Sequence, residues 1–204
     1  MILYGTSKSR ASRSLVMLEE LRLVYDHVPL FSPGRNHAAD RPILDSINPN
    51  SHIPVLDDDG LIVWESMAIN LYLAEKYGST LLPASPTDRA MTYQWSFWAQ
   101  TEIDRSDWNR ARRSGDESQI RSDREALIGA LGILDQALGD RPFLLGDQLT
   151  VVDINVATTL SEPHELGLIG WQRADPAEAG LKALSTWLRK VASRPSYKRV
   201  LSLP

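Results

Sequence analysis

The chain of 204 residues contains no cysteine. It therefore has no disulfide bond, no thiolate ligand for a metal and no thiol nucleophile of its own. The sequence also shows no signal peptide and no apolar run long enough to span a bilayer, so we expect a cytoplasmic protein without a membrane partner. The four histidines do not cluster, and we predict no metal site.

The composition is neither strongly charged nor poor in apolar residues. The formal net charge is −4, which argues against a partner nucleic acid bound by bulk electrostatics. With 43% hydrophobic and 24% charged residues, the chain has an ordinary globular composition, and disorder is not expected. A chain of this length can bury a core as one large domain or as two small ones.

The N-terminal part alternates strands and helices. Apolar runs at Met1–Tyr4 and Val24–Leu30 predict two strands, and leucines at three-residue spacing from Leu15 predict a helix between them. A strand, a helix and a strand in this order imply parallel pairing with a right-handed crossover. A short helix is expected next, starting at Asp40, because Ile43, Leu44 and Ile47 share a helical face.

A hairpin and a helix complete this part. The β-rich runs Val55-Leu56 and Leu61–Trp64 flank an Asp/Gly-rich turn, which predicts a β-hairpin. A helical pattern from Met67 to Tyr77 follows, with Ser66 as the expected N-cap and Gly78 just past its end. The order βαβ-α-ββα is the thioredoxin-like layout, so residues 1–80 are predicted to form an α/β domain of that kind.

The remainder is predicted to be all-helical. Residues 81–86 contain two prolines and no periodicity, and we interpret them as a linker. Residues 87–204 then form an all-α domain, with Thr87 capping its first helix and Thr150–Asp153 forming a capping box. Apolar residues recur at helical spacing in four segments, at 88–109, 120–138, 151–161 and 181–192.

One long motif resembles a known family. The stretch I-P-V-L…E-S, preceded by N-P and followed by A-I-x-x-Y-L-A-x-K-Y-G, is similar to the glutathione-binding half of the cytosolic glutathione S-transferases. Phe143–Gln148 before the capping box and Arg194-Pro195 near the end extend the resemblance over nearly the whole chain. It implies a homodimeric enzyme that conjugates the thiolate of its co-substrate glutathione to small apolar electrophiles.

The resemblance also assigns a glutathione site. It implies a cis peptide bond at Pro54, with the backbone of Ile53 pairing with the cysteinyl part of glutathione. Glu65 and Ser66 would hold the γ-glutamyl amine and carboxylate, in keeping with the preference of a helix start for a bound carboxylate and of an acidic residue for an ammonium group. His52 stands where the family often has Gln or Lys beside the glycyl carboxylate.

The catalytic residue is expected in the first loop. Gly5–Arg13 is rich in hydroxyls and cations, and aligning it with the serine-type pattern of the family places Ser9 on the catalytic serine. Ser12 is the runner-up, and the guanidinium of Arg10 could also favour a thiolate. The loop departs from the family at Ser7, where proline is usual.

The electrophile pocket is the least defined part of the site. Trp95, Trp98, Glu102 and Arg105 are candidate lining residues, although tryptophans at helical spacing are also typical of a core. The same thiolate could serve a glutathione-dependent peroxidase or isomerase. A transferase-like binding or scaffold protein without catalysis is the alternative outside the enzymes.

Overall fold

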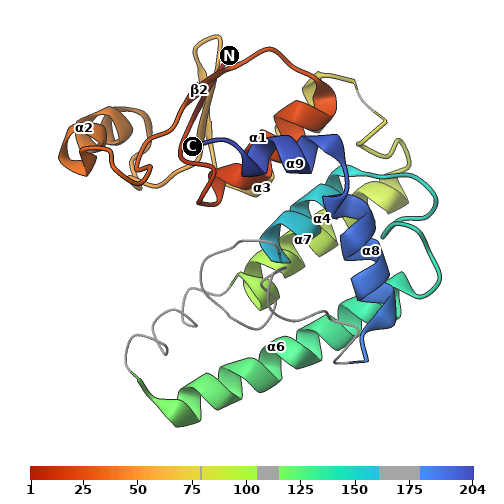
Figure 1. The fold of residues 1–204 in the computed structure, drawn as a ribbon. Helices are drawn as coiled ribbons and strands as arrows, with labels where there is room; N and C mark the ends of the chain where they lie inside the picture. Colours follow the sequence, from red (N-terminus) through yellow and green to blue (C-terminus); the bar gives the residue numbers. More distant parts are fainter. Residues whose placement is uncertain (79, 105–114, 161–179) are drawn as a thin grey trace. The chain divides into compact units, whose positions relative to one another are not determined.

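A computed structural model describes residues 1–78, 80–104, 115–160 and 180–204 of the chain (Figure 1). The chain divides into two compact units, Met1–Leu82 with Ser193–Pro204, and Pro83–Ala192. The division between Leu82 and Pro83 falls inside the segment expected as a linker. The final segment groups with the first unit, whereas the sequence analysis assigned it to the helical part.

The first unit contains a four-stranded sheet in the order β2-β1-β3-β4. Strands β1 (Ile2–Tyr4) and β2 (Asp26–Val28) are parallel, as the predicted crossover requires. Strands β3 (Val55–Asp58) and β4 (Leu61–Trp64) form the predicted antiparallel hairpin, and β3 also pairs antiparallel with β1. The turn between β3 and β4 has positive φ angles at Asp59 and Gly60, which suit a tight hairpin.

Three helices accompany this sheet. Helices α1 (Ala11–Leu21) and α3 (Ser66–Lys76) pack against each other, and Figure 1 shows them on one side of the strands with α2 (His37–Ile47) on the other. Leu44 of α2 forms a buried cluster with Leu30 and Val55. The sheet is therefore the middle layer of the predicted thioredoxin-like α/β domain.

Asp58 ties the hairpin to α3. It is buried at the end of β3, and its carboxylate accepts hydrogen bonds from Lys76 at 2.6 Å, from Tyr72 at 2.6 Å and from Tyr77 at 3.1 Å. Burial would raise the pKa of Asp58, but these three donors outweigh it and the pKa is lowered. The helix that carries Ser66 is thus anchored at its far end to the sheet.

A last helix returns to the first unit. Helix α9 (Pro195–Leu201) packs on α1, and Figure 1 shows the two side by side. The side chain of Arg194, just before α9, donates to Glu20 at 2.6 and 2.8 Å, and Arg199 pairs with Glu19 at 3.2 Å. The sequence analysis noted the Arg-Pro pair but did not predict this helix.

The regular elements of the second unit are all helices within its described residues, apart from an isolated bridge between Phe143 and Gly146. It contains α4 (Pro86–Trp98), the π-helix η1 (Ala99–Ile103), α6 (Glu117–Leu138), α7 (Val151–Leu160) and α8 (Lys182–Ala192). Helix α7 packs against α4, η1 and α8, and all its residues are buried. In the described part of the chain, no helix combines the length and the apolar character that crossing a membrane would need.

One arm of the predicted capping box is seen at the start of α7, where Asp153 caps the Thr150 N–H, whereas the Asp153 N–H donates to the Thr150 carbonyl at 3.1 Å. The buried carboxylate of Asp153 accepts hydrogen bonds from the Thr150 N–H at 2.9 Å and from the Leu144 N–H at 2.8 Å. The indole N–H of Trp187 on α8 adds a bond of 2.9 Å to the same carboxylate. Asp153 therefore joins α7, the loop before it and α8.

Two predicted helix starts were wrong. Helix α4 is capped by Ser85, whose hydroxyl accepts from the Asp88 N–H at 3.4 Å, and Thr87 lies inside the helix. Ser66 is the first residue of α3, and the N-cap position belongs to Glu65. Glu65 has φ 75°, which turns the chain between β4 and α3 in a way that the sequence pattern does not reveal.

Candidate functional site

The loop between β1 and α1 begins at Gly5, where the neighbouring side chains leave no room for a Cβ. Gly5 has φ +132°, and a Cβ added to it would lie 2.8 Å from the Ala11 Cβ and 3.1 Å from the Ile53 Cβ. Its N–H donates to the Val28 carbonyl at 2.9 Å, and its carbonyl lies 2.8 Å from the His27 Nε2. The close approach brings the predicted catalytic loop next to the predicted peptide-binding edge at Ile53.

Ser9 lies just before α1, next to Arg10 at the N-cap position. Its hydroxyl oxygen accepts from the Ala11 N–H at 3.2 Å and donates to the Thr6 carbonyl at 2.7 Å. The side chain is partly exposed. Ser9 can therefore keep the bond from Ala11 while its proton turns to a different acceptor, since a hydroxyl rotates freely about its C–O bond.

The other hydroxyls and cations of the loop are placed differently. Ser12 is partly buried in the first turn of α1, and its N–H donates to the Ser9 carbonyl at 2.9 Å. Ser14 is buried, and its hydroxyl has no hydrogen-bond partner in the described part of the chain. Arg10 is exposed just before the helix. Only Ser9 combines partial exposure with a hydrogen bond to an N–H of the helix start.

Glu65 and Ser66 lie together where β4 leads into α3. Glu65 is exposed, and its carbonyl accepts the first helical hydrogen bond from the Ile69 N–H at 2.9 Å. Ser66 is buried at the first position of the helix. A non-glycine residue with positive φ at such a point is a form of strain that clusters at ligand sites.

Arg13 was not predicted as a site residue, although it contacts Ser66. Its side chain is fully buried on α1, and its Nη1 donates to the Ser66 hydroxyl at 3.4 Å. The Asn70 side chain on α3 donates to the Arg13 carbonyl at 3.3 Å. These contacts connect the start of α1, which carries the catalytic candidate, with the start of α3. The stretch Gly5–Arg13 contains two arginines, and the sequence gives no signal that Arg13 is the buried one.

The peptide bond between Ile53 and Pro54 is cis, as the resemblance implies. No hydrogen bond among the described residues involves the backbone N–H or C=O of Ile53, so both groups are available to a ligand. The side chain of His52 is exposed, and its carbonyl accepts from the Asn48 side chain at 2.7 Å. The turn that carries these residues is therefore fixed by Asn48.

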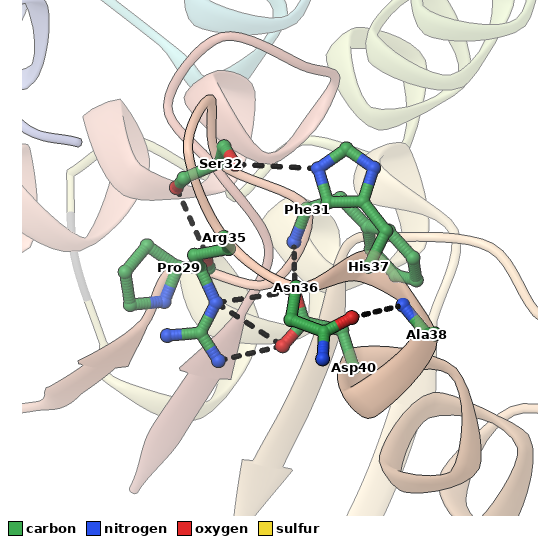
Figure 2. A network of polar contacts seen from close by, with 8 residues as sticks. All are labelled: Pro29, Phe31, Ser32, Arg35, Asn36, His37, Ala38 and Asp40. Atoms are coloured by element: carbon green, nitrogen blue, oxygen red, sulfur yellow. Dashed lines mark hydrogen bonds and ion pairs between the residues drawn. The ribbon is translucent and has the colours of Figure 1, made fainter.

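Figure 2 shows the polar network that holds the loop between β2 and α2. The buried carboxylate of Asp40 accepts from the Phe31 N–H at 2.8 Å and from the Arg35 side chain, whose Nη2 lies at 2.6 Å. Arg35 holds the pKa of Asp40 below its usual value. Burial acts in the opposite direction, and the Phe31 N–H adds to the effect of Arg35. The ring of His37 lies edge-on to Phe31, and its Nε2 lies 3.3 Å from the Ser32 carbonyl.

The candidate residues for the electrophile pocket belong to the second unit. Trp95 is buried on α4, and its ring meets that of Trp98 in a T-shaped contact with centroids 5.0 Å apart. Trp98 is partly buried, and Glu102 is exposed on η1. Arg105 lies outside the described residues. Trp95 is thus part of the core of its unit. Within the described ranges, no group of acidic and histidine side chains could hold a metal ion.

Two sequence models of protein families match the chain. The model described as "Glutathione S-transferase, N-terminal domain" matches residues 1–75, and "Glutathione S-transferase, C-terminal domain" matches residues 100–190. The glutathione S-transferase GstB of Escherichia coli is 30% identical to this chain over 216 residues, which cover 99% of the chain and 98% of that protein.

Solved structures agree with these matches. A glutathione transferase family member from Pseudomonas fluorescens, crystallised with two glutathione bound, has a TM-score of 0.82 at 27% identity and covers 100% of this chain and 92% of its own. A theta class glutathione S-transferase from Xanthomonas axonopodis, with glutathione bound, has a TM-score of 0.77 at 26% identity and covers 98% of this chain and 96% of its own.

Proposed function

The chain belongs to the glutathione S-transferase family, and we propose that Ser9 activates the thiol of glutathione in the reaction that it catalyses. The protein is a glutathione transferase, which joins the thiolate of its co-substrate glutathione to small apolar electrophiles. The observation that carries the proposed role of Ser9 is its hydroxyl at the N-terminal end of α1, hydrogen-bonded to the Ala11 N–H.

The chemical task of Ser9 is to stabilise a thiolate at neutral pH. A free thiol has a pKa near 8.5, and moving it to about 6.5 needs roughly 2.7 kcal/mol of preference for the anion. A hydroxyl that donates to a charged acceptor supplies about 1.5–3 kcal/mol. The start of a helix adds about 0.3–1 kcal/mol. A single serine at the start of α1 is therefore sufficient, and no side chain has to remove the proton.

The hydrogen bond that Ser9 accepts makes it a better donor. The Ala11 N–H lies 3.2 Å from the Ser9 oxygen and withdraws electron density from it. The Ser9 proton, which points to the Thr6 carbonyl at 2.7 Å, would turn to the sulfur when glutathione binds. A thiolate is a stronger acceptor than a neutral carbonyl, so this exchange is favourable.

Three further segments are proposed to hold the peptide. The unpaired backbone of Ile53 suits strand-like pairing with the cysteinyl part, with Pro54 setting the local geometry. Glu65 would bind the γ-glutamyl ammonium, and the start of α3 at Ser66 would bind its carboxylate. The exposed imidazole of His52 is proposed to donate to the glycyl carboxylate.

We also propose that the enzyme is a homodimer in the cytoplasm. Tyr93 and Phe97 lie one turn apart on α4 with 40% and 61% of their surfaces exposed, which supports an apolar contact face. Light scattering at micromolar concentration checks this state. The cytoplasm is the compartment in which glutathione is kept reduced, as the co-substrate has to be.

The Ser9→Ala variant tests the proposed mechanism. Loss of the hydroxyl should raise the pKa of bound glutathione by about one to two units, because one bond to a charged acceptor is lost. The pKa is read from the ultraviolet absorbance of the bound thiolate, and kcat with an aryl halide should fall about 10- to 100-fold near pH 6.5.

Two further variants sharpen this test. Ser12→Ala removes the other candidate hydroxyl. Ser46→Ala removes an exposed hydroxyl on α2 and serves as the control. If Ser12→Ala raises the thiol pKa and Ser9→Ala does not, the role passes to Ser12. If neither changes it while glutathione still binds, a serine hydroxyl is not the activating group.

A further inference from the structure

Both hydrogen-bond donors of Ser7 point to the end of the described chain. The Ser7 hydroxyl donates to the Leu203 carbonyl at 2.6 Å, and the Ser7 N–H donates to the Pro204 carbonyl at 2.9 Å. Ser7 is buried, with 6% of its surface exposed. The segment Leu203-Pro204 thus holds one residue of the catalytic loop through two bonds.

The bond to the Ser7 N–H also fixes the orientation of the Thr6 carbonyl. The Thr6 C=O and the Ser7 N–H belong to one planar peptide unit, so a partner of one group fixes the direction of the other. The Thr6 carbonyl accepts from the Ser9 N–H at 3.2 Å and from the Ser9 hydroxyl at 2.7 Å. One rigid plane therefore connects Leu203-Pro204 with the serine proposed to activate the thiol.

The segment approaches the loop from a firmly attached helix. Helix α9 packs along α1, and Arg194 makes two hydrogen bonds to Glu20, which also accepts from Ser196. Burial would raise the pKa of Glu20, but Arg194 and Ser196 outweigh it and the pKa is lowered. Because α9 is held to the same helix that Ser9 precedes, Leu203-Pro204 meets Ser7 at a fixed place.

Ser7 is the point at which the loop departs from the serine-type pattern. A proline there has neither an N–H nor a hydroxyl and could not make either bond. The two bonds from Ser7 are therefore possible only because this chain has serine where the family usually has proline.

We infer that Ser7 and Leu203-Pro204 are positioning residues: they orient the Thr6–Ser7 peptide, whose carbonyl accepts from the Ser9 N–H and so fixes the place from which the Ser9 hydroxyl can turn to the glutathione sulfur. This inference rests on the proposed role of Ser9. Without the two bonds, the Thr6–Ser7 plane can rotate, and the Ser9 backbone loses the carbonyl that accepts from its N–H at 3.2 Å.

Three variants remove the contact in different ways. Ser7→Ala removes only the hydroxyl bond, Ser7→Pro removes both donors, and a chain shortened to end at Ser202 removes both acceptors while leaving the catalytic loop unchanged. Ser202→Ala is the matched control, because its exposed hydroxyl bonds only to the Arg199 carbonyl and not to the loop.

The readout is the pKa of the bound glutathione thiol, with glutathione affinity and melting temperature measured alongside. The shortened chain and Ser7→Pro should each lower the thiolate fraction at pH 6.5 by about three- to tenfold, which is the effect expected from one misdirected hydrogen bond. Ser7→Ala should have a smaller effect in the same direction, and Ser202→Ala none.

A double-mutant cycle separates positioning from general destabilisation. In a Ser9→Ala background, shortening the chain should leave the thiol pKa where Ser9→Ala alone put it, because the group to be positioned is gone. A purely structural role of the segment would lower the melting temperature in both backgrounds without moving the thiol pKa in either.

These variants distinguish a failure of the inference from a failure of the proposed role of Ser9. If Ser9→Ala shifts the thiol pKa and neither Ser7→Pro nor the shortened chain does, the inference is overturned and the proposed function stands. If Ser9→Ala itself leaves the pKa unchanged, the proposed role of Ser9 fails. Should the shortened chain not fold, Ser7→Ala and Ser7→Pro decide the question, because they leave α9 and its contacts with Glu20 in place.

Discussion

Replacing Asp40 with alanine should destabilise the first unit far more than the same change at Asp45. Both residues lie on α2, so the change in helix propensity is matched. Asp40 is buried and accepts from the Phe31 N–H and from Arg35. Asp45 is exposed, and its carboxylate pairs with Arg41 at 3.3 Å and accepts from the Ser51 hydroxyl.

The magnitude follows from what each carboxylate holds. Loss of the charged acceptor of the Phe31 N–H costs about 1.5–3 kcal/mol. The pair between Asp40 and Arg35 adds about 0–1 kcal/mol, because 41% of the Arg35 side chain is exposed. We therefore expect Asp40→Ala to lower the free energy of unfolding by about 2–4 kcal/mol and Asp45→Ala by less than about 1 kcal/mol.

Urea titration and thermal melting measure this difference. For a protein of this size the Asp40→Ala loss corresponds to a fall in melting temperature of about 5–15 °C. All variants have to be compared at one protein concentration, because the proposed dimer would make stability depend on it. If the two variants melt within about 1 °C of each other, the network of Figure 2 does not stabilise the unit and the reasoning is refuted.

The stability difference between wild type and Asp40→Ala should also shrink as the pH falls. The pKa of Asp40 is held below its usual value in the folded protein, chiefly by Arg35. A carboxyl group with a lowered pKa stabilises the fold fully above its unfolded pKa of about 3.9, and this contribution is lost as the pH falls through the folded value. The gap between wild type and Asp40→Ala should therefore be constant from neutral pH down to about pH 5 and shrink below about pH 4.

Two further substitutions test the loop and the helical unit. Gly5→Ala places a Cβ 2.8 Å from that of Ala11 and should lower both the melting temperature and kcat. Gly34 also has a positive φ, but a Cβ there would meet no atom within 4 Å, so Gly34→Ala should affect kcat little. Equal kcat losses would contradict a steric cause. Asp153→Ala should cost at least about 3 kcal/mol, and more than Trp187→Phe, because the carboxylate accepts from Leu144, Thr150 and Trp187 whereas the indole supplies one bond; equal losses in urea titration would speak against this.

The sequence predicted the elements whose signals are local. The hairpin was found because its two β-rich runs and the turn residues between them lie within ten positions, and α6 because its leucines recur up to a final Gly139. The cis bond at Pro54 and the pair Glu65-Ser66 came with the family motif. These features need no knowledge of the rest of the fold.

The features that were missed depend on distant partners. Helix α9 is short and was not predicted, and its contacts with Glu19 and Glu20 on α1 are remote in sequence. Asp58 was interpreted as a turn residue because nothing in the sequence indicates that Lys76 and two tyrosines converge on it. The contact of Ser7 with Leu203 spans 196 positions, beyond the reach of any local pattern.

The return of the chain to its first unit has a consequence for synthesis on the ribosome. About 100 residues separate Leu82 from Ser193, which completes that unit. About 170 residues lie between the end of α1 at Leu21 and the start of α9 at Pro195, so at about 5–20 residues per second α1 waits roughly 9–35 s for α9 to be synthesised. During that time the acidic residues Glu19 and Glu20 lack their arginine partners, and Ser7 lacks both of its acceptors. The nascent N-terminal unit can form its sheet early, but its catalytic loop is finished last.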